Sequence, residues 1–254
     1  MEKSYHIKIK EKDAGAYAIL TGDPARVPEI AKYLDGAVKA GQNREYTTYS
    51  GTLCGERVVV MSVGIGGPSM AIGVEELAKL GVKTFIRVGT SGGINLDVKS
   101  GDLVIPTAAV RQEGTSSEYL PYQFPAASDF FVTSALYAAA EKNMQKAHIG
   151  IVQSKDSFFG ELEPSRQPIR ERLLELWEIY KRTGVLASEM ECAALFTLGT
   201  VLHLRTGAVL LSIWNEERNK EFGDDSECHD VARMYKVAVD ALKLIIEKDK
   251  RNCR

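Results

Sequence analysis

The chain has 254 residues, enough for one large α/β domain or two small ones. Its 32 lysine and arginine residues nearly balance its 34 aspartate and glutamate residues, so the net charge of -2 gives no general attraction to nucleic acid or to an anionic membrane. No segment approaches the run of about 18 apolar residues that a membrane-spanning helix needs. Any anion-binding site must therefore be built locally from a few placed cations.

The cysteines and the N-terminus bear on where the protein works. The polar N-terminal segment lacks the apolar core of a signal peptide. The cysteines are scattered without a C-x-x-C pair, which argues against a disulfide scaffold or a zinc site: Cys54, Cys192, Cys228 and Cys253. We therefore expect a protein of the reducing cytoplasm.

Short β-type runs alternate with amphipathic helical stretches along the whole chain. Strands are expected at 16–20, 46–53, 57–63, 84–88, 102–110, 148–154 and 207–213. Helices are expected at 23–34, 68–80, 129–143, 166–181, 189–202 and 231–247. This alternation predicts an α/β fold in which helices cover a mainly parallel sheet, as a single domain over 1–254. The least regular stretches, 112–127 and 160–168, are where we expect specificity loops.

Glycine-rich segments follow two of the expected strands. Gly22, Asp23 and Pro24 open the first helix, with Arg26 one turn later, which suits either a capped helix with a surface arginine or an anion site. Residues 64–69 (Gly-Ile-Gly-Gly-Pro-Ser) also join a strand to a helix. Their sixth position is serine where a dinucleotide-binding loop has glycine, so a tight turn is favoured over a nicotinamide site.

Arg87 lies inside an apolar strand, directly before an expected glycine-rich turn at 89–93. A guanidinium does not lose its charge, so its burial is costly unless an anion or hydrogen-bond acceptors compensate. A protein carboxylate or a bound phosphate meets that need, and the glycine-rich turn favours phosphate.

The segment 188–191 allows two interpretations. Ser188 and Glu191 have the S-x-x-E spacing of a capping box, which would occupy the Glu191 carboxylate. Alternatively Glu189 and Glu191 face different ways, and one of them accepts hydrogen bonds from both hydroxyls of a ribose. On spacing alone, the cap is favoured.

Taken together, these segments resemble the nucleoside phosphorylase family, most closely its branch of bacterial uridine phosphorylases. The resemblance rests on residues 22–26, 44–48, 64–69, 87–90 and 189–191, which occur in the family's order and at compatible spacings. It implies a three-layer αβα fold with a mixed, mainly parallel central sheet. It also implies reversible phosphorolysis, in which a pyrimidine nucleoside and phosphate, uridine above all, give the free base and ribose 1-phosphate.

The same resemblance implies a role for individual residues. Phosphate would be bound by Gly22, Arg26, Arg44, Arg87 and Thr90. The ribose would be held by His6, Thr90, Met190 and Glu191. The base would contact Phe158, Glu161, Arg166, Ile213 and Trp214. Three of these would carry the catalysis: Arg87, Glu191 and Arg166. Arginines suit the phosphate because the reaction develops charge that positioned ions stabilise, and Arg166 would donate to the base carbonyls.

The resemblance further implies an assembly. The family forms dimers, commonly three in a hexameric ring, so His6 and Arg44 would reach the site of a neighbouring subunit. No metal or organic cofactor is required for the chemistry. Some members hold a monovalent cation, which places a candidate K⁺ or Na⁺ site between subunits near Glu45, Ile65 and Ser69.

The base loop departs from the family pattern. The family's uridine phosphorylases carry glutamine at the position of Glu161, and an ionised glutamate only accepts hydrogen bonds. A glutamate suits guanine at least as well as uracil. Against a purine, Trp214 stands where the related purine enzymes place an aspartate proton donor, unless Glu216 substitutes. Pyrimidine remains favoured.

Two further functions stay open from the sequence. A phosphate-independent nucleosidase would share the fold without needing the arginines. A non-catalytic nucleoside-binding subunit would explain the altered base loop.

Overall fold

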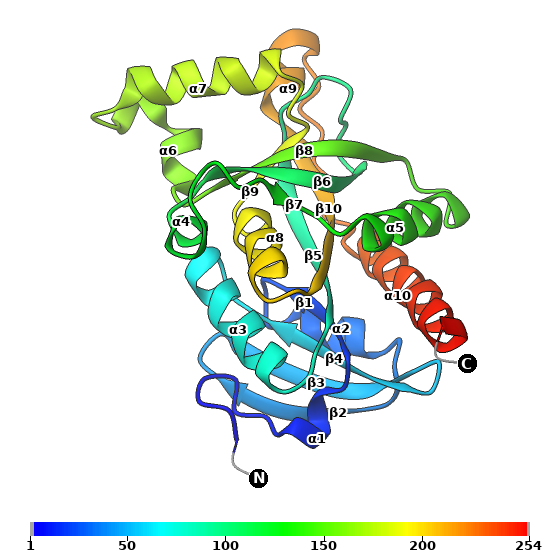
Figure 1. The fold of residues 1–254 in the computed structure, drawn as a ribbon. Coiled ribbons are helices and arrows are strands. Elements are labelled where there is room, and N and C mark those ends of the chain that lie inside the picture. The colour runs from blue at the N-terminus through cyan, green and yellow to red at the C-terminus, as the bar shows by residue number, and fades with distance from the viewer. Residues whose placement is uncertain (1–2, 253–254) are drawn as a thin grey trace.

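Within residues 3–252, ten strands form one mixed sheet with helices on both of its faces (Figure 1). The computed structural model describes residues 3–252; Cys253 lies outside them. The strands are β1 (Tyr17–Thr21), β2 (Asp35–Asn43), β3 (Tyr46–Leu53), β4 (Glu56–Ser62), β5 (Thr84–Gly93), β6 (Leu103–Gln112), β7 (Ala126–Ala127), β8 (Ala147–Lys155), β9 (Ala187–Glu189) and β10 (Arg205–Asn215). The helices are α1 (Glu11–Ala14), α2 (Arg26–Ala31), α3 (Gly67–Lys79), α4 (Thr115–Tyr119), α5 (Phe130–Lys142), α6 (Phe158–Leu162), α7 (Arg170–Arg182), α8 (Cys192–Val201), α9 (Glu216–Phe222) and α10 (Ala232–Asn252), with a 3-10 turn at Pro164–Arg166.

The strand order is β10-β6-β8-β9-β5-β1-β4-β3-β2, with β7 paired to β6. Parallel pairing joins β4, β1, β5 and β10, whereas β2, β3 and β4 form antiparallel hairpins. Because β10 pairs with both β6 and β5, the strands β5, β10, β6, β8 and β9 close into a ring. The expected α/β class with a mixed, mainly parallel sheet is confirmed.

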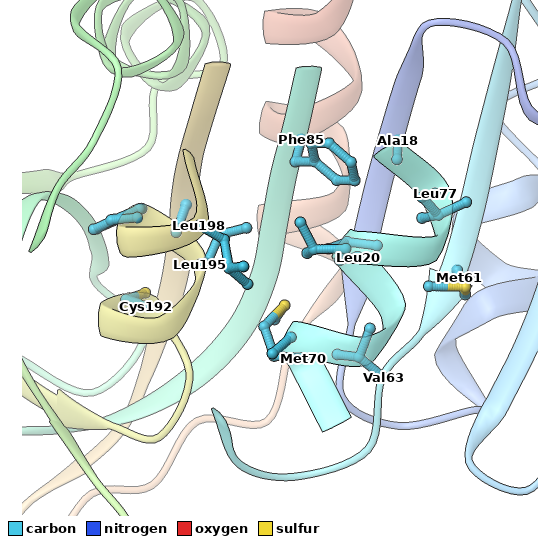
Figure 2. Packing of buried hydrophobic residues seen from close by; sticks show 14 of the residues in the cluster. Ala18, Leu20, Met61, Val63, Met70, Leu77, Phe85, Cys192, Leu195 and Leu198 are labelled. Carbon is cyan, nitrogen blue, oxygen red and sulfur yellow. The ribbon is translucent and has the colours of Figure 1, made fainter. Parts of the chain in front are cut away.

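Alternating side chains of the central strands build two cores. Along β1, Ala18 and Leu20 face α3 and α8, whereas Ile19 faces the opposite side, where α2, α5 and α10 pack. Figure 2 shows the first core, in which Met70 and Leu77 of α3 and Leu195 of α8 meet over β1, β4 and β5. This packing fixes the position at which α8 begins, immediately after Glu191.

The expected turn at 89–93 is wrong, because β5 continues through it. The parallel pairing of β5 with β10 extends to Gly93, opposite Asn215. A Cβ at Gly93 would lie 2.5 Å from Asn215 Nδ2, so the glycine lets the two strands approach closely. The glycine-rich segment is therefore a strand, and its lack of side chains allows β10 to approach it closely.

The edge strand β2 and the short elements escaped sequence prediction. β2 carries mostly exposed side chains and lacks the apolar alternation of a half-buried strand. β9, α4 and α6 are each five residues or shorter, below the length at which periodicity is informative. Within residues 3–252, no helix has the length and apolar character to cross a membrane.

Replacement of Leu195 by alanine tests the packing of α8. The side chain is fully buried, so Leu195→Ala is expected to lower the free energy of unfolding by about 2–5 kcal/mol. Urea denaturation measures this loss, with Leu244→Ala on α10 as the matched control, because Leu244 is 38% exposed. Equal losses in the two variants would contradict the placement of α8 in the core.

Candidate active site

A cavity of about 920 Å³ lies at the end of the sheet where β1, β5, β8 and β10 carry their C-terminal residues. Residues far apart in the sequence meet there, as is common at the carboxyl ends of parallel strands. The cavity is lined by eleven of the residues that the sequence singled out: Gly22, Arg26, Ile65, Arg87, Thr90, Phe158, Glu161, Met190, Glu191, Ile213 and Trp214.

Arg87 lies beneath the cavity and is nearly fully buried. Its Nε and Nη2 donate to Glu189 Oε2 at 3.3 and 3.1 Å, and Nη2 also contacts Glu191 Oε2. The compensating anion in the fold is thus a pair of protein carboxylates, the alternative that the sequence analysis left open but did not favour. Within the described residues, Nη1 has no hydrogen-bond acceptor, so it remains free to bind an anion in the cavity.

Glu189 organises the start of α8. Its side chain is fully buried and accepts from the backbone N–H of Glu191 at 2.8 Å and of Cys192 at 2.9 Å. Ser154 Oγ of β8 also donates to it and accepts from Ala193 N–H at 2.9 Å. The carboxylate thereby satisfies the free N–H groups of the helix end as well as Arg87.

The capping-box interpretation of 188–191 is wrong. Ser188 lies in β9 and binds Gln153, Lys155 and Glu161 rather than the helix end. The Glu191 carboxylate is therefore free of a cap, and its Oε1 accepts from Gly66 N–H at 2.6 Å.

Glu191 is an acid in an environment that disfavours its charge. Burial raises its pKa, Arg87 opposes the rise, and the second buried carboxylate, Glu189, adds to it. Two carboxylates share one guanidinium here, so the net effect is a raised pKa. Glu191 lines the cavity next to Met190 and contacts Arg87. An ionised carboxylate at this place can accept hydrogen bonds from a ligand's hydroxyls.

Arg26, Thr90 and Gly22 line the cavity together with Arg87, and the pairing of β1 with β5 sets Thr21 beside Val88. The turn before α2 is held by Asp23, whose Oδ1 accepts from Ala25 N–H at 2.8 Å. The expected helix from 23 therefore begins three residues later, at Arg26. Two guanidinium groups, the Thr90 hydroxyl and the backbone of Gly22 make this part of the cavity lining suitable for an anion such as phosphate.

The cavity also contains a charged pair that the sequence analysis missed. Lys155, the last residue of β8, lies 2.7 Å from Glu161 Oε1 and beside the Phe158 ring. The sequence offered one signal for Lys155, which directly follows the strand expected at 148–154. Trp214 and Ile213 line the same cavity.

Arg166 is placed differently from the expectation. It lies in the 3-10 turn outside the cavity, its side chain is 70% exposed, and it pairs with Glu163 one turn earlier. Sequence similarity suggested a donor to the base, but in this fold the nearby carboxylate binds the guanidinium on the surface. Lys155, and not Arg166, is the cation that the fold places in the cavity lining beside Glu161.

His6 and Arg44 do not line the cavity of their own chain. His6 Nδ1 lies 2.7 Å from Glu76 Oε1. Burial opposes ionisation of Glu76, but hydrogen bonds from the backbone of Ile7 and His6 lower its pKa. Arg44 is exposed at the turn between β2 and β3, with a φ of 52°. The predicted contribution of both residues to a neighbouring subunit stays a prediction.

The candidate cation site lies at the turn after β4. Gly64, with a φ of 70°, brings Glu45 near Ser69, whose Oγ contacts the carbonyl oxygens of Ile65 and Gly66 at 3.4 and 3.2 Å. Carbonyl, hydroxyl and carboxylate oxygens are suitable ligands for a hard cation. Between residues 3 and 252, no cluster of three histidine, cysteine or acidic side chains suits a metal ion.

The sequence is similar to known proteins over nearly its whole length. Residues 16–247 match the family model described as the phosphorylase superfamily. The chain is 52% identical to the uridine phosphorylase of Treponema pallidum (strain Nichols), over 96% of this chain and 95% of that protein. It is 41% identical to the uridine phosphorylase of Thermococcus kodakarensis, over 98% and 89%. It is also 37% identical to the guanosine phosphorylase of Halorubrum lacusprofundi, over 89% and 90%.

Substitution of Gly89 tests the placement of Arg87. A Cβ at Gly89 would lie 1.9 Å from Arg87 Nη1, so Gly89→Ala must displace the guanidinium. We expect the Gly89→Ala protein to bind inorganic phosphate about 10- to 100-fold more weakly than the unmodified protein, because it loses a charge-assisted hydrogen bond. Titration calorimetry measures the change.

Gly92→Ala is the matched control for Gly89→Ala. Gly92 lies on the same strand and lines the same cavity, but its Cβ would meet only Trp214 O, at 3.9 Å. An equal loss of phosphate affinity in both variants would contradict the role given to Arg87, because simple filling of the cavity would then explain the effect.

Proposed function

Because the chain belongs to the phosphorylase superfamily, we propose that it is a pentosyltransferase that catalyses the reversible phosphorolysis of a pyrimidine nucleoside. Uridine and phosphate would give uracil and ribose 1-phosphate, the activity named for its relatives from Treponema and Thermococcus. One observation carries the proposal: a single cavity is lined by Arg26 and Arg87, by the Glu191 carboxylate, and by the aromatic side chains of Phe158 and Trp214.

These groups match the parts of the reacting complex. Arg26 and Nη1 of Arg87 hold phosphate below the sugar, so that one phosphate oxygen faces C1′. Glu191 accepts hydrogen bonds from the ribose hydroxyls and fixes the ring above the nucleophile. The phosphate oxygen bonds to C1′ as the bond from C1′ to the base nitrogen breaks, and the bonding electrons leave with the base. Catalysis then rests on positioning and on charge stabilisation.

Guanosine is the second candidate substrate. The Glu161 carboxylate in the cavity lining would accept from two N–H groups of guanine, and one relative is named a guanosine phosphorylase. Glu216, the sequence alternative for a purine proton donor, pairs with Lys220 and does not line the cavity. Trp214 does line it, which supports a pyrimidine.

The assembly and setting of the enzyme belong to the same proposal. We infer a homo-oligomer built from dimers, in hexameric form, in which His6 and Arg44 complete the neighbour's site. K⁺ or Na⁺ would bind near Glu45, Ile65 and Ser69, with a structural role and no part in the reaction. The enzyme would work in the cytoplasm, in nucleoside salvage, without a metal or organic cofactor for its chemistry.

Release of free base is the direct test of this function. Uridine, thymidine, inosine and guanosine are each incubated with and without phosphate, and the free base is quantified by chromatography. We expect turnover of uridine that depends on phosphate. Turnover without phosphate would make the protein a nucleosidase, and binding without any turnover would make it a nucleoside-binding subunit.

Arg26→Ala tests the phosphate site without burying an unpaired charge, because the Arg26 side chain is 25% exposed. We expect kcat/KM for phosphate to fall about 10²-fold, typical for one charged contact to a transition state. Lys32→Ala at the end of the same helix is the control, since Lys32 is 68% exposed and pairs with Glu29. A normal kcat/KM for phosphate in Arg26→Ala would contradict the assignment.

A further inference from the structure

The lining of the cavity contains an ion pair that no step of the proposed phosphorolysis of uridine uses. Lys155 Nζ lies 2.7 Å from Glu161 Oε1, and both side chains line the cavity. On the basis of the proposed function, we propose that this pair recognises the lactam edge of the nucleobase. Glu161 accepts from the ring N–H, and Lys155 donates to the carbonyl oxygen next to it.

Lys155 retains a hydrogen-bond donor for a ligand. An ammonium group has three N–H donors. Within the described part of the chain, Nζ contacts two acceptors, Glu161 Oε1 and Ser188 Oγ, which leaves one N–H free. Nζ also lies 5.9 Å from the centre of the Phe158 ring, which lines the same cavity. The free donor is therefore near the wall against which a base would pack.

Glu161 retains an acceptor. The hydroxyl of Ser188 has one proton and two acceptors within reach: Gln153 Oε1 and Glu161 Oε2, the latter at 2.8 Å. Gln153 is buried, and its Nε2 donates to Gln112 Oε1 at 2.7 Å, so its own oxygen is held toward Ser188. When the proton goes to Gln153, Glu161 Oε2 keeps its lone pairs for a donor in the cavity.

The pair is also rigid. Gln112 Oε1 accepts from the Tyr180 hydroxyl at 2.8 Å as well as from Gln153, which anchors the network to α7. Only 8% of the Lys155 side chain and 15% of the Glu161 side chain are exposed. A buried pair of this kind adds little to stability over apolar residues, whereas a fixed donor and acceptor add selectivity.

A fixed acceptor beside a fixed donor matches one kind of base edge. Uracil and thymine present N3–H beside O4, and guanine and hypoxanthine present N1–H beside O6. Cytosine and adenine present an amino group beside a ring nitrogen without hydrogen, so each of their groups would face a like partner. The glutamate that replaces the family's glutamine is thus completed by Lys155, which supplies the donor that a carboxylate lacks.

Lys155 also stabilises the leaving group. When the bond from C1′ to the base nitrogen breaks, the electron pair spreads over the ring and onto its carbonyl oxygens. A hydrogen bond from an ammonium to such an oxygen strengthens as negative charge develops on it. The departed anion then takes its proton from water, and Lys155 stays protonated.

Lys155→Met keeps the length of the side chain and removes the donor. We expect kcat/KM for uridine to fall about 10²–10³-fold, with the KM for phosphate unchanged. The loss is expected to be markedly smaller with 5-fluorouridine, whose fluorine already stabilises the leaving anion. Lys220→Met, an exposed lysine on α9, is the matched control and should keep full activity.

Several outcomes would overturn the inference. One is a loss below about 3-fold in Lys155→Met; another is an equal loss with uridine and 5-fluorouridine, which indicates a purely structural role. The inference would also be overturned if the unmodified enzyme cleaved cytidine as fast as uridine. If Lys155→Met does not fold, the neutral double variant Lys155→Met with Glu161→Leu, which adds no donor, carries the same comparison of uridine with 5-fluorouridine.

The two candidate bases are separated by Glu161→Gln. A carboxylate accepts from two N–H groups of guanine, and an amide oxygen that must share its group with an NH₂ does not, so guanosine should lose more activity than uridine. An unchanged ratio would place Glu161 away from the base. An unmodified enzyme that releases base from neither nucleoside would contradict the proposed function itself, whereas an active enzyme with an unaffected Lys155→Met contradicts this inference alone.

Discussion

The site depends on the buried ion pair between Arg87 and Glu189. The pair joins the strand β5 to the segment between β9 and α8, and Glu189 also binds two backbone N–H groups at the start of that helix. Because a buried guanidinium and a buried carboxylate are each costly alone, neither can move without the other. Glu191 is consequently directed toward the cavity and Gly66, and one face of Arg87 remains free for an anion.

In the proposed complex, the charged groups of the cavity correspond to the parts of a nucleoside and phosphate. Arg26 and Arg87 would bind the anion, Glu191 would bind the diol, and the pair Lys155 and Glu161 would bind the base edge. Close backbone approach makes this arrangement possible, since any side chain at residue 89 would collide with Arg87. In the proposed reaction, the same groups would position the substrate and stabilise the charge that develops.

The amino-acid sequence predicted the long strands and helices because their apolar periodicity is strong. It also singled out Arg87, since a charge within an apolar strand requires an explanation. The cap at α8 could not be predicted, because two glutamates at neighbouring positions compete for one helix end and only tertiary packing decides between them. The sequence also could not decide whether Lys155 or Arg166 lines the cavity. Which of two cations faces the cavity depends on the course of the loop between β8 and α7, which has no periodicity.

A double-mutant cycle on Arg87→Met and Glu189→Gln tests the central claim most directly. Urea denaturation of the unmodified protein, the two single variants and the double variant gives the interaction free energy of the pair. We predict that each single variant is strongly destabilised and that the coupling is at least about 1.5 kcal/mol, since contacting residues of one network couple within about 0.5–3 kcal/mol. Additive losses, with a coupling below about 0.5 kcal/mol, would contradict the claim that this pair organises the site.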